Sequence, residues 1–229
     1  TNVTAGSYNV KVNDANGCSN TLSVELTEPT ELIATIAGIT NNLCSDETKG
    51  SIQLNVVGGS TPYTFNWNNG DTSQNVSNLA KGEYAVKVTD AKGCLKELSA
   101  TITEPSMLLA SVKNIIDVNC FGDQSGAVNL DVTGGVTPYT FAWNNGSKDK
   151  NLKNIAAGDY QVTVQDKNGC SQILNAEVTQ PQKLIVKLDS INQVLCHGEN
   201  KGFVDITVEG GAFPYFYTWS NGSEGEDLV

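Results

Sequence analysis

Hydrophobic and polar residues alternate along most of this chain in short stretches. Ile52, Leu54 and Val56 alternate with polar neighbours, and Tyr84 and Val86 do the same further on. Alternation with a period of two is typical of a β-strand with one buried face. Gly-Gly, Asn-Gly and Asp-x-x-Gly turn signals separate the stretches. No segment of ten or more residues shows a helical period. The pattern therefore predicts an all-β protein.

One aromatic stretch occurs three times, at residues 58–70, 134–146 and 210–222. Each copy reads as a Gly-Gly/Pro turn, an alternating aromatic strand and an Asn-Gly turn. Side chains two residues apart share one face of a strand, and each buried aromatic removes roughly 150–250 Å² from water. We expect these strands to form the centre of each core, with a tyrosine from a later strand packed beside them. The predicted core residues are Tyr63, Phe65, Trp67, Tyr84, Tyr139, Phe141, Trp143, Tyr160, Tyr215 and Trp219.

The copies follow each other at a constant spacing of 76 residues, as Trp67, Trp143 and Trp219 show. A constant spacing without insertions indicates tandem copies of one module. We place the boundaries at the repeated Glu/Gln-Pro dipeptides. This gives a partial repeat at 1–29 (a back hairpin), complete repeats at 30–105 and 106–181, and a partial repeat at 182–229 (front strands). Because the chain begins and ends inside a repeat, we expect it to be a piece of a longer protein.

The segment from Leu79 to Tyr84 has the pattern Leu-x-x-Gly-x-Tyr before an alternating strand. This pattern is similar to the tyrosine corner of immunoglobulin-like sandwiches. Together with six or seven short strands per repeat, it predicts tandem immunoglobulin-like β-sandwich modules.

Composition excludes two classes of partner. The 229 residues carry a net charge of −11 and include no Arg, whereas binding to nucleic acid or to an anionic membrane needs clustered cations. No apolar run approaches the ~20 residues of a membrane helix. We therefore expect no nucleic acid partner and no membrane insertion.

Each repeat places two cysteines at fixed positions, which suggests an oxidising compartment. Three pairings fit the spacing of Cys18, Cys44, Cys94, Cys120, Cys170 and Cys196. Cys44–Cys94 and Cys120–Cys170 lie within repeats. Cys18–Cys44, Cys94–Cys120 and Cys170–Cys196 bridge a last hairpin to the next first strand. Cys44–Cys170 joins adjacent repeats. The expected strand directions put Cys44 and Cys94 at opposite ends of a module, so we favour Cys44–Cys170.

Repeated acids in the turns allow two interpretations. Asp14, Asp90 and Asp166 begin Asp-x-x-Gly turns, while Asp46, Asp123 and Glu199 follow the first cysteine. Asp favours tight turns because its side chain bonds the main chain nearby. Calcium also binds such oxygens, but no Asp-x-Asp-x-Asp ladder is present.

Other chemistry is sparse. His197 is the only histidine and is not repeated, there is no Cys-x-x-Cys, and no Gly-x-Ser-x-Gly occurs. We expect no catalytic residues, no confident metal site and no cofactor other than the possible calcium. The chain is therefore predicted not to be an enzyme.

Three motifs occur in order in each complete repeat. They are Cys-(x)5-Gly, Gly-Gly-x-x-Pro-Tyr-x-x-x-Trp-x-x-Gly and Gly-x-Tyr-x-Val-x-Val-x-Asp-x-x-Gly-Cys. Together they resemble the SprB repeat of Bacteroidota surface proteins, and the resemblance covers the whole chain. It implies export by the type IX secretion system, a location on the outer surface of a Gram-negative cell, and a gliding-motility adhesive filament. It also implies neighbouring repeats and the gliding and secretion machinery as partners, and no catalytic residues. Asp189-Ser190-Ile191 resembles a Bacteroidota O-glycosylation signal at Ser190.

Three hypotheses for function follow. The first is a structural stalk segment of a repetitive cell-surface adhesin. The second is an array of carbohydrate-binding modules that hold extracellular polysaccharide on exposed aromatics. The last copy has Phe213 and Phe216 where the first has Thr61 and Thr64, and Tyr217 lies beside them. Those two phenylalanines are either an extra exposed contact or a local repacking. The third hypothesis is a spacer in a secreted multidomain enzyme.

Overall fold

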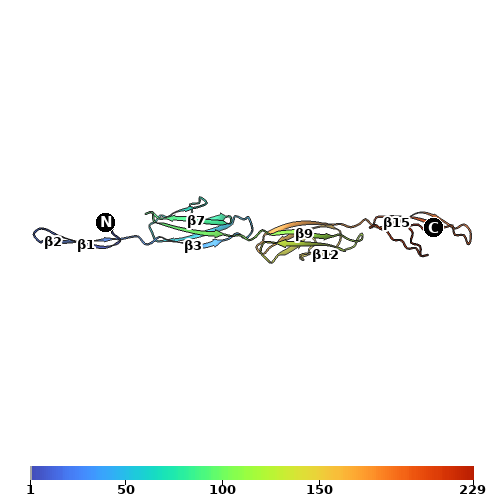
Figure 1. The fold of residues 1–229 in the computed structure, drawn as a ribbon, viewed down its shortest axis with the longest axis horizontal. Helices are drawn as coiled ribbons and strands as arrows, with labels where there is room; N and C mark the ends of the chain where they lie inside the picture. The colour runs from blue at the N-terminus through green and yellow to red at the C-terminus, as the bar shows by residue number, and fades with distance from the viewer. Residues whose placement is uncertain (1) are drawn as a thin grey trace. The chain divides into compact units, whose positions relative to one another are not determined.

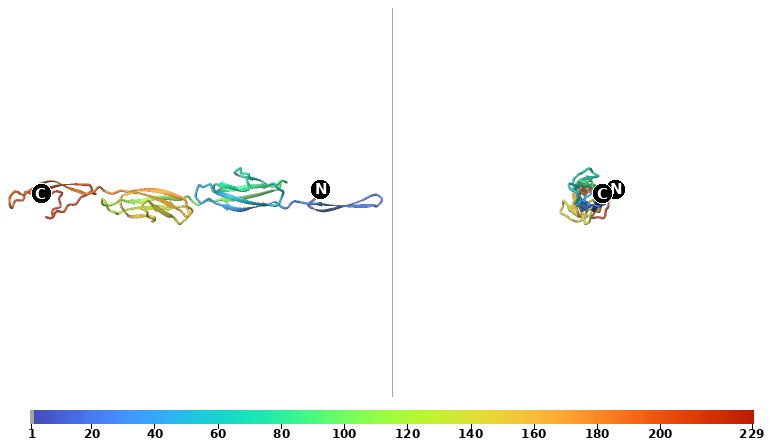
Figure 2. Two further views of the ribbon diagram at one scale, coloured as in Figure 1. Left: turned by 180° about the vertical axis from the view of Figure 1, so that it is seen from behind. Right: turned by 90° about the vertical axis from the view of Figure 1, so that its left-hand side faces the viewer.

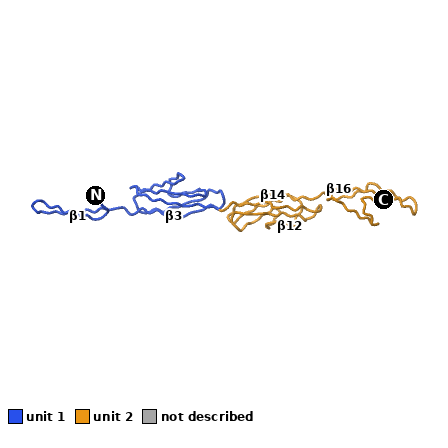
Figure 3. The backbone as a smooth tube through the Cα atoms, in the orientation of Figure 1, with its two compact units in different colours: residues 1–104 blue, residues 105–229 orange. Residues whose placement is uncertain are grey.

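The computed structural model describes residues 2–229. These residues form sixteen strands and no helix, which confirms the predicted all-β class. The chain divides into two compact units, residues 1–104 and 105–229 (Figure 3). Within the described residues, no helix is long and apolar enough to cross a membrane.

The first unit begins with a two-stranded hairpin and continues into a sandwich of six strands. The hairpin is formed by β1 (Gly6–Asn13) and β2 (Ser19–Leu26). The sandwich strands are β3 (Ile33–Thr40), β4 (Gly50–Val57), β5 (Thr64–Trp67), β6 (Val76–Leu79), β7 (Gly82–Thr89) and β8 (Leu95–Ile102). They form two three-stranded antiparallel sheets, in the orders β3-β4-β6 and β5-β7-β8. Figure 1 shows the two sheets as separate layers, with β3 in one and β7 in the other.

The second unit repeats this plan and adds a second hairpin. Its sheets have the orders β12-β10-β9 and β11-β13-β14. The strands are β9 (Leu109–Ile116), β10 (Gly126–Thr133), β11 (Thr140–Trp143), β12 (Leu152–Ile155), β13 (Gly158–Gln165), β14 (Ser171–Val178), β15 (Ile185–Asn192) and β16 (Phe203–Glu209). The last two pair with each other as an antiparallel hairpin. Figure 2 shows the same layering of the sandwich from behind.

This arrangement is an immunoglobulin-like sandwich of six strands. Constant-type immunoglobulin domains pair four strands with three, and each complete repeat here has three with three. The predicted tyrosine corner is present: the hydroxyl of Tyr84 donates to the carbonyl oxygen of Ala80 at 3.1 Å. Tyr160 makes the same bond to Ala156 at 2.9 Å. The predicted fold class is therefore confirmed.

The first and last strands of each sandwich lie side by side and connect its two sheets. The N–H of Asn42, just after β3, donates to the carbonyl oxygen of Thr103, just after β8, at 3.0 Å. In the second sandwich Val118 and Thr179 make the same bond at 2.9 Å. Because the carboxyl ends of the two strands meet, β3 and β8 run parallel, and so do β9 and β14.

Each sandwich has its own core, and the centre of that core is aliphatic. The most deeply buried side chains of the first sandwich are Ile52, Val88 and Ile102, and those of the second include Val128 and Val164. The tryptophans are also buried, with Trp67 at 2% exposure and Trp143 at 5%. Two separate clusters result, one within each complete repeat.

The other aromatic residues lie at the edge of the cores rather than at their centre. Tyr63, Phe65 and Tyr84 are half-buried against the first cluster, and Phe141 and Tyr160 against the second. Tyr139, Tyr215 and Trp219 are half-buried outside both clusters. Of the predicted aromatic core residues, only Trp67 and Trp143 are therefore fully buried, and they lie beside an aliphatic centre. A tyrosine keeps its hydroxyl near the rim, where polar partners lie.

The two partial repeats expose their apolar faces. Every described position of β1 and β2 is exposed, including Val10 and Val12. The third aromatic stretch does not form the strand that the sequence predicts, because residues 216–219 pair with no strand. In the complete repeats this strand pairs with β7 or β13, and residues 182–229 contain no counterpart of that partner. The boundaries at Pro29, Pro105 and Pro181 fall between strands, and the four-part division stays a prediction.

Candidate functional site

The Gly-Gly loop of every repeat is bonded to the segment through which the chain enters that repeat. The N–H of Gly59 donates to the carbonyl oxygen of Thr30 at 2.8 Å. Gly135 makes the same bond to Ser106 at 2.9 Å, and Gly211 to Gln182 at 2.8 Å. The acceptor in each case directly follows the boundary proline. The loop therefore fixes the start of its own module.

Glycine is required in this loop for two reasons. Gly58 has φ +73°, a conformation that residues with a side chain rarely adopt. A Cβ at that position would also lie 1.9 Å from the carbonyl oxygen of Glu31. At Gly134 the corresponding distance is 1.8 Å, to Met107. The motif tyrosine then closes the loop, because the hydroxyl of Tyr63 donates to the carbonyl oxygen of Gly58 at 2.5 Å.

The repeated aspartate joins the last turn to the same loop. Asp90 is buried, and its Oδ1 accepts hydrogen bonds from the N–H groups of Lys92 at 2.9 Å and Cys94 at 2.8 Å. Its Oδ2 accepts one from Ser60 at 2.9 Å, just after the Gly-Gly pair. The bond from Ser60, followed by those from Cys94 and Lys92, holds the pKa of the Asp90 carboxyl below its ordinary value.

Asp166 has the same partners in the second sandwich. Its Oδ2 accepts from Val136 at 2.9 Å, and its Oδ1 accepts from Asn168 and Cys170, both at 2.9 Å. The carboxylate of Asp14 in the first hairpin accepts the two turn bonds, from the N–H groups of Asn16 and Cys18. These aspartates therefore organise turns. Three bonds on one buried carboxylate also connect loops that lie about thirty residues apart in the sequence.

The acids after the first cysteine are arranged differently. Asp46 has φ +60°, and its N–H donates to the Oε2 of Glu104 at 3.0 Å. Lys81 forms an ion pair with Glu104 at 2.6 Å, which lowers the pKa of that carboxyl. The N–H of Asp123 donates to the carbonyl oxygen of Cys120 at 3.1 Å. Among residues 2–229, no group of three or more His, Cys, Asp or Glu side chains is placed to hold a metal. Calcium at these positions stays a prediction.

The cysteines fall into two classes. Cys44 and Cys170 are disulfide-bonded, whereas Cys18, Cys94, Cys120 and Cys196 are free and exposed. Cys44 follows β3, whose carboxyl end meets that of β8, while Cys94 precedes β8 at its other end. Eight residues at ~3.3 Å separate the two ends by roughly 26 Å, but a disulfide allows only about 4.4–6.8 Å between Cα atoms. The pairing Cys44–Cys94 is therefore incompatible with the sandwich. The bridging pair Cys94–Cys120 does not form either, because both cysteines are free.

Two single residues singled out from the sequence lie on the surface. His197 is exposed in the turn after β15. Ser190 is exposed at the end of β15, and its hydroxyl donates to the carboxylate of Asp205 at 3.3 Å. An exposed hydroxyl is accessible to a glycosyltransferase, and its glycosylation stays a prediction.

The last copy exposes the two phenylalanines that distinguish it. Phe213 is 86% exposed and Phe216 is 90% exposed, so neither is repacked into the module. The ring of Phe213 meets that of Tyr215 edge to face, with centroids 5.9 Å apart. Tyr215 and Phe216 line an apolar groove of about 260 Å³ between β15, β16 and the aromatic stretch. Tyr217 lies in this groove, and burial there raises its pKa, with Glu226 adding to the effect.

A polar hollow that no sequence motif predicts lies on the outer face of β13 and β14. It has a volume of about 490 Å³ and is lined by Asn144, Asp159, Gln161, Asn175 and Glu177, with Tyr160 beside them. The side-chain N–H of Asn144 donates to the carbonyl oxygen of Asp159, and that of Gln161 to Asn175, both at 3.0 Å. Alternating polar positions along the two strands are the signal that identifies this face.

Three segments of the chain match a family model described as the SprB repeat. They are residues 37–72, 112–148 and 188–224. Each runs from the first strand of a repeat, through the first cysteine and the Gly-Gly loop, to the turn after the tryptophan. No curated protein matches the chain.

Solved structures of domain arrays are similar at low identity. Three N-terminal domains of the Hoc protein of bacteriophage RB49 are 13% identical, with 84% of this chain and 78% of that chain covered and a TM-score of 0.40. Extracellular domains 3–5 of Drosophila OTK are 14% identical, with 77% and 71% covered and a TM-score of 0.35. The family matches, by contrast, fall on the three motif-bearing segments, and they show that this chain carries three SprB repeats.

Proposed function

We propose that this chain is a non-catalytic stalk segment of a repetitive bacterial cell-surface adhesin. The observation that carries the proposal is the repetition of one module with its own hydrophobic core. Each complete repeat has its own core, and in all three copies the Gly-Gly loop bonds to the residue after the boundary proline. Modules of this kind can be added in series, because each one brings its own core.

The surface chemistry agrees with a spacer role. The repeated motif residues with functional groups, Asp90 and Asp166, hold turns in place. The net charge of −11 and the disulfide fit a hydrated position outside the cell. We extend the proposal to a Gram-negative outer surface reached through the type IX secretion system, in a filament that serves gliding motility. The SprB repeat motifs are the support for this extension.

Labelling of intact cells tests the proposal. Antibodies raised against this chain should bind unpermeabilised cells of the source organism, and brief protease treatment of intact cells should remove the signal. A cytoplasmic protein treated in parallel must keep its signal. If labelling requires permeabilisation, the surface location and the stalk function are both excluded.

A carbohydrate-binding role is the second candidate, because Phe213 and Phe216 are almost fully exposed and Phe216 lines an apolar groove. Exposed aromatic rings can stack on sugar rings, and the amide-lined hollow over β13 and β14 offers hydrogen bonds to hydroxyls. A glycan array probed with the whole chain tests this function. Binding that is lost in Phe213→Ser/Phe216→Ser would favour it over a pure spacer.

A further inference from the structure

We propose that the loop between β11 and β12 binds an acidic polysaccharide through three lysines, Lys148, Lys150 and Lys153. The ligand class is a chain of sugars that carry carboxylate or sulfate groups. The inference concerns residues 147–153 of the second sandwich and goes beyond the spacer role. Because this surface differs from that of the exposed phenylalanines, the two sites can be tested separately.

Cations are concentrated in this loop although the chain as a whole is acidic. Residues 147–153 contain three lysines and one aspartate, a local net charge of +2 in a chain of net charge −11. A chain extends by at most ~3.3–3.6 Å per residue, so Lys148 and Lys153 are separated by no more than roughly 18 Å. At physiological salt, charges more than ~8 Å apart are largely screened. An anion at the loop therefore interacts mainly with the lysines and little with acids elsewhere.

The fold makes no use of the three lysine side chains. All three residues are exposed, and the ion pairs found among residues 2–229 involve other lysines. Lys150 and Lys153 line a hollow of about 400 Å³, together with Asp149 and Asn151. Each lysine ammonium is a point charge with three hydrogen-bond donors. The hollow therefore offers an anionic group two cations that no protein carboxylate neutralises.

The main chain that carries the lysines is held in place by the sandwich. The indole N–H of Trp143 donates to the carbonyl oxygen of Asp149 at 2.9 Å, and its main-chain N–H donates to that of Ser147 at 3.0 Å. The N–H of Leu130 in β10 donates to the Oδ1 of Asn151 at 2.9 Å. The loop is therefore ordered before a ligand arrives, which reduces the entropy lost on binding.

The first copy has the same anchors without the lysines. The indole N–H of Trp67 donates to the carbonyl oxygen of Ser73 at 2.9 Å, and the N–H of Leu54 donates to Asn75 at 3.0 Å. The three lysine positions hold uncharged residues there, Thr72, Gln74 and Ser77. The loop conformation therefore does not require lysine.

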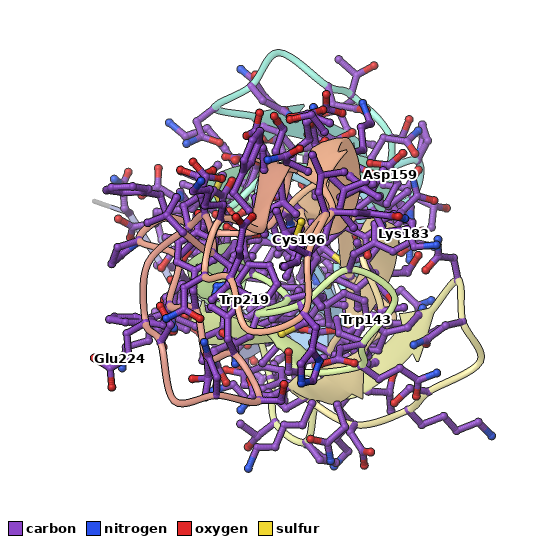
Figure 4. The ribbon with its side chains drawn as sticks, turned by 90° about the vertical axis from the view of Figure 1, so that its right-hand side faces the viewer. Trp143, Asp159, Lys183, Cys196, Trp219 and Glu224 are labelled. Carbon is purple, nitrogen blue, oxygen red and sulfur yellow. The ribbon has the colours of Figure 1, made fainter. Side chains whose placement is uncertain are left out.

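The third copy carries the opposite charge at two of these positions. Glu224 and Glu226 stand where the second copy has Lys148 and Lys150. The anchor is again present, because the indole N–H of Trp219 donates to the carbonyl oxygen of Gly225 at 2.9 Å. Figure 4 shows Glu224 pointing outward from its segment. One anchored loop thus presents neutral, cationic or anionic side chains, and only the second copy suits an anionic ligand.

The number of cations favours a polysaccharide over other polyanions. Duplex DNA carries one negative charge per ~1.7 Å, and its binding depends on many cationic contacts. An acidic polysaccharide carries its charges further apart, on separate sugar units. The amide nitrogen of Asn151, in the same hollow, can donate to the hydroxyl groups between them. Because a polymer repeats its anionic group, weak single contacts add up when one strand binds several chains.

Binding of the whole chain to immobilised polysaccharides tests the proposal. The chain should bind polygalacturonate, which carries carboxylates, or dextran sulfate at low salt, and it should not bind uncharged dextran. Raising NaCl from ~50 to ~200 mM should weaken the binding by up to ~20-fold, because three lysine contacts each contribute a slope of about −0.7. Absence of binding to both acidic polymers at low salt, or equal binding to uncharged dextran, would overturn the proposal.

Two variants assign the binding to the loop. Lys148→Thr/Lys150→Gln/Lys153→Ser introduces the residues of the first copy and should lower the affinity roughly tenfold, because three exposed charge contacts are lost. Lys148→Glu/Lys150→Glu introduces those of the third copy and should lower it further through repulsion. Unchanged hydrogen exchange in β10 and β13 shows that the sandwich stays folded. Natural affinity in either variant contradicts the proposal.

A control separates the loop from the total charge of the chain. Lys92→Gln/Lys96→Gln/Lys167→Gln removes the same charge from exposed positions elsewhere and should bind as the natural chain does. An equal loss of binding in this control would mean that total charge, and not the loop, determines the binding. Tighter binding to duplex DNA, or to vesicles that contain anionic lipid, than to both acidic polysaccharides would assign the lysines to another class of ligand and also overturn the proposal.

Discussion

The main-chain N–H of Gly135 donates a hydrogen bond of 2.9 Å to the carbonyl oxygen of Ser106. The two residues lie on either side of the first hairpin of the second sandwich, which comprises β9 and β10. The bond joins the Gly-Gly loop to the residue after Pro105, and its counterparts recur in the other two copies. The beginning of each module is therefore fixed by a loop that comes much later in its sequence.

Gly134→Ala should destabilise the second sandwich much more than Gly146→Ala does. Both glycines have positive φ, +69° and +87°, so alanine costs roughly 1–2 kcal/mol at either position through backbone strain. Only at Gly134 would the new methyl also meet a main-chain oxygen, at 1.8 Å, whereas Gly146 has nothing within 4 Å. Chemical denaturation of the full chain measures the difference. Equal losses of stability in the two variants would show that the loop does not pack against the entry segment.

Trp143→Ala should lower the stability of the second sandwich by roughly 3–5 kcal/mol, the range for large-to-small changes in a core. Trp143 is 5% exposed, and its indole N–H donates to the carbonyl oxygen of Asp149 at 2.9 Å. Hydrogen exchange resolves the two sandwiches in one molecule. Amides of β10 and β13 should exchange faster, while those of β4 and β7 serve as an internal control. Unchanged protection in β13 would contradict a core position for Trp143.

The stability of the first sandwich should fall in acid partly through Asp90. Three N–H donors, Ser60 foremost, hold the pKa of Asp90 below its ordinary value of 3.8. A group with a lowered folded pKa contributes stability that is fully present above its unfolded pKa. That contribution is lost as the pH falls through the folded pKa. Denaturation between pH 7 and pH 2 should show a shallower decline in Asp90→Asn than in the natural chain. Parallel curves would exclude Asp90 from the acid response.

The sequence predicts local features well and long-range contacts poorly. Leu-x-x-Gly-x-Tyr identifies the tyrosine corner at Tyr84, because its hydrogen bond reaches only four residues back. Gly58-Gly59 is recognisable as a turn, but its bond to Thr30 joins segments almost thirty residues apart. Glu104 accepts a hydrogen bond from the N–H of Asp46 and forms an ion pair with Lys81. No sequence motif predicts these contacts, because the partners are distant in the sequence.

The aromatic stretch of the last copy shows a second limit. Alternation predicts a strand over residues 216–219 as firmly as over 140–143, yet only the latter forms one. A β-strand is stabilised by hydrogen bonds to a neighbouring strand, and β11 pairs with β13. The same reason explains why Tyr215 and Trp219 stay outside a closed core, while the two earlier tryptophans are buried. Alternation therefore predicts which face a strand would bury, but not whether a partner covers it.

Peptide mapping under non-reducing conditions tests the disulfide pairing. We propose that Cys44 pairs with Cys170, so that the first cysteine of one repeat joins the second cysteine of the next. The partners that this rule gives to Cys18, Cys94, Cys120 and Cys196 fall outside residues 1–229, and these four are the free cysteines. Digestion should yield one linked peptide pair that contains Cys44 and Cys170. A Cys44 peptide linked to Cys18 or Cys94 would contradict the rule.

Stretching single molecules under reducing conditions tests the central claim, that complete repeats are separate modules in series. The account predicts two unfolding events of equal length, because residues 30–105 and 106–181 have separate cores. Each event should release about 76 residues at ~3.3–3.6 Å, or ~250 Å before the folded length is subtracted. Trp143→Ala should weaken one event and leave the other unchanged. A single event that releases both repeats together, or extension without any event, would contradict the account.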